Sequence, residues 1–121
     1  MRKLANDVHR WPATHADWRF AARFAAQGIE SRGSGGGAFR LLYADFLHEA
    51  ARWIPALKGI DAEDRLRESA ALWSNTAQHC KTAFTEGNAA ALADAGQVAS
   101  RISRQEEELM RDLSNTVRPL L

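Results

Sequence analysis

Apolar side chains recur along this chain every three or four residues, the spacing that places them on one face of a helix. The period of two that marks a half-buried strand does not appear, and β-branched residues are few. The pattern predicts helices over about residues 2–10, 14–30, 38–54, 61–85 and 88–114. We therefore expect an all-α fold, a bundle of four to five helices in a single domain over residues 1–121.

The last two predicted helices are the longest, at about 25 residues or about 37 Å each. The short segment EGN, from Glu86 to Asn88, joins them. A connection this short makes neighbouring helices antiparallel. Gly87 fits just past the end of the first of the two helices, where a left-handed backbone conformation is common.

Proline and capping residues mark the expected ends of the other helices. Pro12 should close the first helix, because its ring removes a backbone donor. Thr14 is the expected N-cap of the second helix, with Asp17 three residues on as a capping-box partner. Pro55 should end the third helix, and Asp61 is the expected N-cap of the fourth.

One apolar stripe on each helix is expected to face the core. The stripes are Trp18, Ala21, Ala22, Ala25 and Ile29 on the second helix, Phe39, Leu42, Phe46, Ala50 and Trp53 on the third, Leu66, Ala70, Trp73, Ala77, Cys80 and Phe84 on the fourth, and Leu92, Ala95, Ala99, Ile102, Leu109 and Leu113 on the fifth. The four tryptophans, Trp11, Trp18, Trp53 and Trp73, are expected to be core aromatics, one or two of them lining a pocket because an indole N–H seeks a partner.

Composition and charge then narrow the class of protein. The chain has 121 residues and a net charge of +1, which favours neither nucleic acid nor an acidic membrane surface as partner. No apolar run approaches the roughly 20 residues of a membrane span, and the basic N-terminus lacks the apolar segment of a secretory signal. The single cysteine, Cys80, cannot form an internal disulfide. We expect a cytoplasmic protein.

The segment SRGSGGGAFR, from Ser31 to Arg40, carries the sharpest local signal. Glycines just before a helix permit close backbone approach, and the first helical turn offers unpaired N–H groups. Arg32, Gly35, Gly36, Gly37 and Arg40 are therefore candidates for binding an anion or an anionic substrate. The alternative is a simple corner between helices, with Glu30 or Asp45 pairing an arginine. No Walker A or dinucleotide-binding pattern accompanies the glycines.

The remaining reactive side chains form no recognisable constellation. Cys80 follows His79, but adjacent helical positions point about 100° apart, and Cys80 belongs to an apolar stripe. The four histidines show no metal-binding spacing, so we expect no metal, no cofactor and no catalytic residue. Glu106 interrupts the stripe of the last helix. It lies either at a frayed end of the bundle or in an ion pair with Arg32, Arg40 or Arg65.

Four segments carry a resemblance to a known family. LANDVHRW, IESRGSGGGAFRLLYADFLHEAA, LRESAALWSNTA and ISRQEEELMRDL resemble the C-terminal helical domain of butirosin-biosynthesis-protein-H-like proteins, in the same order over nearly the whole chain. The block from Arg32 to Arg40 is the most specific part of the resemblance. That helical domain is itself a domain of unknown function.

The resemblance implies a context in antibiotic biosynthesis. In that family the helical domain follows a papain-like domain, which supplies a nucleophilic cysteine. The type member transfers an aminoacyl group from an acyl carrier protein to an aminoglycoside. No cysteine lies early in this chain, so the papain-like domain is expected to be absent from it and to act in cis or in trans. The arginine-flanked glycines would then suit a phosphopantetheine phosphate or an acyl carboxylate.

Three functions stay open at this point. The first is a non-catalytic helical accessory domain of a papain-like acyltransferase, with an acyl carrier protein as a further partner. The second is an independent interaction module, such as a homodimer through an exposed apolar helix face. The third is a stand-alone enzyme that uses Glu106 or His48, which ranks last because no nucleophile, base and orienting group come together in the sequence.

Overall fold

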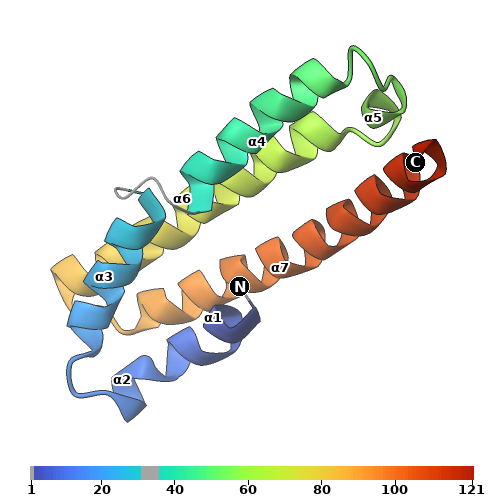
Figure 1. Cartoon of the computed structure of the whole chain (residues 1–121). Coiled ribbons are helices and arrows are strands. Elements are labelled where there is room, and N and C mark those ends of the chain that lie inside the picture. The colour runs from blue at the N-terminus through green and yellow to red at the C-terminus, as the bar shows by residue number, and fades with distance from the viewer. Residues whose placement is uncertain (1, 31–35) are drawn as a thin grey trace.

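The computed structural model describes residues 2–30 and 36–121, and within these ranges the chain forms helices joined by turns, with no strand. The elements in chain order are α1 (Arg2–Asp7), η1 (Val8–Arg10), α2 (Trp11–Thr14), α3 (Trp18–Glu30), α4 (Gly36–Ala50), α5 (Ala56–Gly59), α6 (Ala62–Glu86), α7 (Ala90–Val117) and η2 (Arg118–Leu120). Figure 1 shows them gathered around the two long helices α6 and α7. The predicted all-α bundle is confirmed.

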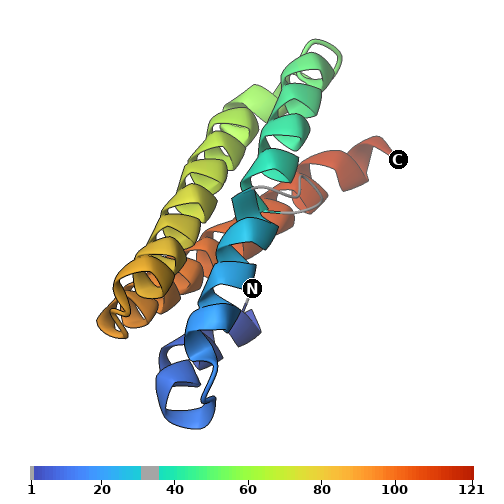
Figure 2. The same cartoon turned by 90° about the vertical axis from the view of Figure 1, so that its left-hand side faces the viewer.

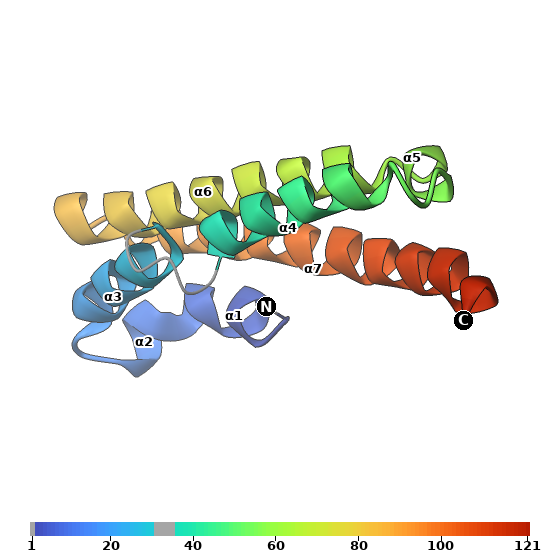
Figure 3. The same ribbon diagram turned by 45° about the horizontal axis from the view of Figure 1, so that its top comes forward.

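The antiparallel pair of α6 and α7 forms the frame of the molecule (Figure 3). The chain reverses at Gly87, whose φ of 62° lies in the left-handed region that closes helices. The stripe predicted for α7 is buried throughout. That of α6 is buried except for Trp73 and Phe84, which are half-buried. The two long antiparallel helices are as predicted.

The shorter helices cover two sides of this frame. α3 and α4 follow one another along α6, and α1 and η1 pack on α7 (Figure 2). At the second contact a Cβ on Gly96 would lie 3.1 Å from Val8 Cγ1 and 3.3 Å from the carbonyl oxygen of Ala5. Glycine at this position therefore lets the N-terminal segment lie close against α7.

The core divides into two clusters along the length of the frame. One joins α4 and α5 to the adjoining parts of α6 and α7; its buried members are Ala44, Leu47, Ala51, Leu57, Ala62, Leu66, Leu109 and Leu113. The other joins η1 and α3 to the opposite ends of the long helices; its buried members are Val8, Ala22, Cys80, Ala83, Ala91, Leu92 and Ala95. The helices α6 and α7 contribute to both clusters and so connect them.

The N-terminal helix boundaries differ from those predicted. Pro12 lies in the first turn of α2, where its missing N–H has no helical partner to lose, and so it does not close the preceding helix. Thr14 ends α2 instead of capping α3, since its hydroxyl donates to the carbonyl oxygen of Arg10 at 3.0 Å. The helix α3 begins only at Trp18.

The segment between α4 and α6 also differs in detail from the prediction. Helix α4 ends at Ala50, and a helical turn follows in which the Ile54 N–H donates to the Ala50 carbonyl at 2.9 Å. Pro55 then precedes the short α5. Asp61 does occupy the N-cap position of α6, but with a left-handed φ of 53° and no hydrogen bond from its side chain to the helix. Proline and aspartate thus marked the right boundary without forming the expected cap.

Candidate functional site

The outer face of α4 is a stripe of large apolar side chains that lies in solvent. It consists of Phe39, Leu42, Phe46 and, in the turn after the helix, Trp53, whose exposed fractions are 50%, 67%, 61% and 85%. These four side chains leave on the order of 500 Å² of apolar surface uncovered, at the upper end of what single proteins carry. The prediction that this stripe faces the core is wrong, and so is the expectation that Trp53 is a core aromatic.

The opposite face of α4 explains the error. This inner face consists of Gly37, Ala44, Leu47 and Ala51, all buried. Three of the four have small side chains or none, so the backbone of α4 can lie close to α6, and bulky rings have no room between the two helices. The stripe with the larger side chains is therefore the solvent-facing one, and the stripe with the smaller side chains faces the core.

A charged residue of α4, Arg40, reaches across the bundle to Glu106 of α7. Its Nε and Nη2 donate to the two carboxylate oxygens of Glu106, each at 2.9 Å, in a bidentate pair. Ser69 and Trp73 of α6 donate to the same carboxylate. The Arg40 guanidinium also lies over the rings of Trp73 and Phe39, at 5.0 and 5.7 Å from their centroids. The predicted pairing of Glu106 with an arginine is confirmed, with Arg40 as the partner.

The surroundings of Glu106 fix its charge. Burial disfavours the carboxylate, but the hydrogen bonds from Arg40, Ser69 and Trp73 outweigh it, so the pKa of Glu106 lies below its ordinary value. Each carboxylate oxygen of Glu106 already accepts a hydrogen bond from at least one of these three side chains. The cluster therefore holds α4, α6 and α7 together, and it does not present a base poised to take a proton.

The glycine corner lies partly outside the described residues. Arg32 and Gly35 fall there, whereas Gly36 and Gly37 open α4 and Arg40 follows one turn later. Two donors of Arg40 are committed to Glu106. Asp45, the alternative partner expected for an arginine of this corner, instead forms an ion pair with Arg67 at 2.9 Å. Anion binding by Arg32, Gly35, Gly36, Gly37 and Arg40 stays a prediction.

A second charged network joins α4 to the start of α6. His48 Nδ1 lies 2.8 Å from an oxygen of Glu63, and Arg67 donates to the other oxygen at 2.9 Å. Hydrogen bonds from His48 and then Arg67 lower the pKa of Glu63, and those to Asp45 and Glu63 raise the pKa of Arg67. Across residues 2–30 and 36–121, no group of three potential metal ligands comes together.

Cys80 is completely buried in the interior of the bundle. Burial raises the pKa of its thiol to about 11, so the thiol stays protonated at neutral pH. A protonated, inaccessible thiol is a poor nucleophile. The interpretation of Cys80 as a small core residue is confirmed.

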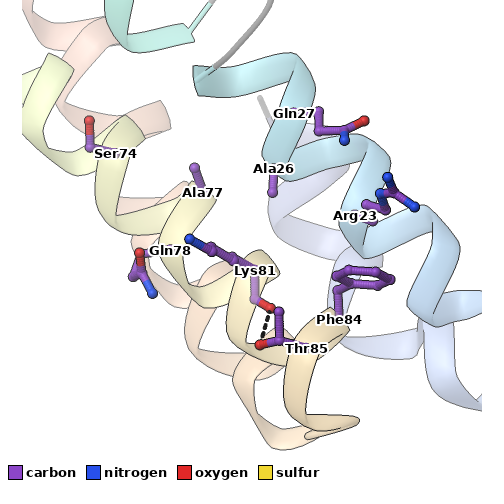
Figure 4. Close-up of a pocket in the computed structure, with 9 residues that line it drawn as sticks. All are labelled: Arg23, Ala26, Gln27, Ser74, Ala77, Gln78, Lys81, Phe84 and Thr85. Carbon is purple, nitrogen blue, oxygen red and sulfur yellow. Dashed lines mark hydrogen bonds between the residues drawn. The ribbon is translucent and has the colours of Figure 1, made fainter.

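A groove of about 480 Å³ lies between α3 and α6 (Figure 4). Its lining residues are Arg23, Ala26, Gln27, Ser74, Ala77, Gln78, Lys81, Phe84 and Thr85. The sequence does not predict this groove, because its polar residues on α6 recur at a helical spacing that also describes an ordinary solvent-exposed face. No pattern in the sequence links that stripe to Arg23 and Gln27, about 50 positions earlier.

These features define a class: an all-α bundle domain with an exposed apolar face on α4 and an internal charged cluster. The chain matches the model of the family named Domain of unknown function (DUF4872) over residues 1–113, and it belongs to that family. No curated protein and no solved structure matches it. None of the helices in the described part of the chain combines the length and apolar character of a membrane span.

Proposed function

We propose that this domain is a non-catalytic accessory domain that packs, through the outer face of α4, onto a papain-like acyltransferase domain. The observation that carries the proposal is the exposure of Phe39, Leu42, Phe46 and Trp53 in one stripe. Large aromatic side chains at this exposure are typical of interface centres, where they contribute most of the binding energy. The resemblance to butirosin-biosynthesis-protein-H-like proteins supplies the kind of partner.

The interior of the bundle supports a structural role for its polar groups. The Glu106 carboxylate accepts from three side chains, and the Cys80 thiol is buried and protonated. Both groups are suited to holding the fold. On this proposal the partner domain supplies the nucleophilic cysteine, and the helical domain supplies a surface.

The decisive experiment measures association of the chain with a papain-like domain from a butirosin-biosynthesis-protein-H-like protein. We expect the isolated chain to be a monomer by light scattering and to form a one-to-one complex with that domain. Phe46→Glu should abolish the complex. Phe20→Glu is the matched control, because Phe20 is a phenylalanine of α3 with an exposed fraction of 68% outside this face. Equal binding by both variants and the wild-type chain would contradict docking at α4.

A second candidate function is self-association through the same face. Phe39 and Trp53 lie symmetrically about Phe46 in the stripe, seven residues before it and seven residues after it. Two copies of α4 crossing antiparallel at Phe46 would therefore set Phe39 of one copy opposite Trp53 of the other. Light scattering separates the two candidates. A dimer that Phe46→Glu converts to monomers supports self-association. A monomer that forms no complex with the papain-like domain contradicts both candidate functions.

The proposal extends to an anionic or carrier-bound substrate at the glycine corner. The first turn of α4 begins with Gly36 and Gly37, and its backbone N–H groups lack partners within the helix. Because Arg40 is tied to Glu106, Arg32 is the better position to test. Arg32→Gln should weaken binding of a holo acyl carrier protein about tenfold, the effect of losing one charge-assisted hydrogen bond. Unchanged binding would leave the segment as a corner between helices.

A further inference from the structure

The groove between α3 and α6 carries positive charge without matching negative charge. Its two walls bring Arg23 and Lys81 to opposite sides, and none of its nine lining residues is acidic (Figure 4). The amides of Gln27 and Gln78 add hydrogen-bond donors to the same walls. Ala26, Ala77 and Phe84 contribute apolar surface to the lining, and the hydroxyl residues Ser74 and Thr85 complete it.

The cations of the groove differ from the four arginines that form ion pairs between helices elsewhere in the bundle. Arg40, Arg65, Arg67 and Arg101 each pair with a carboxylate between helices. Within the described ranges, neither Arg23 nor Lys81 has an acidic partner within ion-pair distance. Two unneutralised cations that flank one concave surface favour an anion there.

The position of the Arg23 guanidinium is set by its neighbours. It lies over the ring of Phe84, 5.3 Å from the ring centroid. The main chain at Phe84 is held in turn by Arg19, whose Nε and Nη2 donate to the Phe84 carbonyl oxygen at 3.2 and 2.7 Å. Because Arg19 is hydrogen-bonded to the backbone in this way, Arg23 is the cation that the α3 wall presents to the groove.

The size and lining of the groove indicate the kind of anion. A volume of about 480 Å³ is larger than a bare phosphate needs and lies in the range of small organic ligands. The apolar lining would contact a hydrocarbon body, while the cations and amides would bind the charged end. We propose that the α3–α6 groove binds a small organic anion, a carboxylate or a phosphate ester that carries an apolar group.

The test is a titration followed by amide chemical shifts, with phenyl phosphate, benzoate, inorganic phosphate and uncharged benzyl alcohol as probes. Phenyl phosphate or benzoate should shift the amide signals of the groove walls and bind at least tenfold more tightly than benzyl alcohol and inorganic phosphate. Lys81→Gln and Arg23→Gln should each weaken that binding about tenfold. Lys58→Gln is the control for charge, because Lys58 is an exposed lysine of α5 at the far end of α6 (Figure 1).

Each contrary result overturns the proposal. Equal affinity for benzyl alcohol would make the groove merely apolar, and equal weakening by Lys58→Gln would make the binding a nonspecific effect of net charge. Absence of shifts in the groove up to about 10 mM phenyl phosphate and benzoate would exclude the site. Phe46→Glu should leave the affinity for phenyl phosphate unchanged, so failure at this groove is distinguishable from failure of docking at α4.

Discussion

The two faces of α4 hold apolar residues of opposite size and opposite fate. The inner face, with Gly37, Ala44, Leu47 and Ala51, is buried, whereas the outer face, with its three rings and a leucine, is in solvent. Close packing of two helices favours small side chains at the contact, so burial follows fit and not size. The larger apolar stripe is consequently the one left over for a partner.

The strongest test of this comparison makes the same substitution on each face of α4. Leu47 has an exposed fraction of 4% and Leu42 one of 67%. Leu47→Ala should lower the free energy of unfolding by about 3 kcal/mol, because it leaves a cavity against α6. Leu42→Ala should change it by less than about 0.5 kcal/mol. Urea unfolding followed by circular dichroism measures both; similar losses would mean that the outer face is covered in solution.

The next largest effect concerns Glu106, the carboxylate that pairs with Arg40 on the inner side of α4. Glu106→Gln should destabilise the bundle by about 2 kcal/mol, because it removes the charge that Arg40 pairs with and points an amide donor at Ser69 and Trp73 or at Arg40. Glu108→Gln, at an exposed position of the same helix, should change stability by less than about 0.5 kcal/mol. Comparable losses in the two variants would argue against the cluster.

The same variant has a defined pH dependence. The folded-state pKa of Glu106 lies below its ordinary value of 4.5, so its stabilising contribution is present above that pH and is lost as the pH falls through the lowered pKa. The stability difference between the wild-type chain and Glu106→Gln should therefore shrink below pH about 4.5. A difference that is constant or grows on acidification would show that the paired carboxylate is not its source.

The long helices could be predicted from the sequence because each has one apolar stripe with little competition. In α7, Leu92, Ile102, Leu109 and the alanines between them form a single stripe, and Gly87 marks the reversal. Helix α4 offers two stripes, and the choice between them depends on the closeness of approach to α6. That distance is a property of the packed pair, and no local pattern reports it.

The charged sites, like the helices, could be predicted from the sequence only in part. The sequence placed Glu106 either at a frayed end of the bundle or in an ion pair with one of three arginines. It could not choose among them, because the partner depends on how far α4 is displaced along α7. The α3–α6 groove was missed for a related reason. Arg23 and Lys81 belong to helical stripes that are unremarkable separately, and they form one surface only when two segments far apart in sequence lie side by side.

A smaller effect tests whether the rule seen on α4 also holds between α7 and the N-terminal segment. Gly96→Ala should cost about 1 kcal/mol, because the new methyl group meets buried Val8 and the Ala5 carbonyl and this outweighs the helix propensity gained. Gly28→Ala, in α3 with nothing within 4 Å, should instead stabilise the chain by about 0.5–1 kcal/mol. Thermal unfolding compares them, and stabilisation by both would show that this contact tolerates a methyl group.

The smallest effect on stability, and the most direct view of the outer face, comes from Trp53. Its exposed fraction of 85% makes Trp53→Phe neutral to within about 0.5 kcal/mol. The other three tryptophans are half-buried, so the variant should lose the component of the fluorescence that emits at the longest wavelength and that iodide quenches most. Unchanged quenching would mean that Trp53 is already covered in solution. Repeating the quenching at lower protein concentration then identifies what covers Trp53. A second copy of the chain dissociates as the concentration falls, whereas a contact within the chain does not.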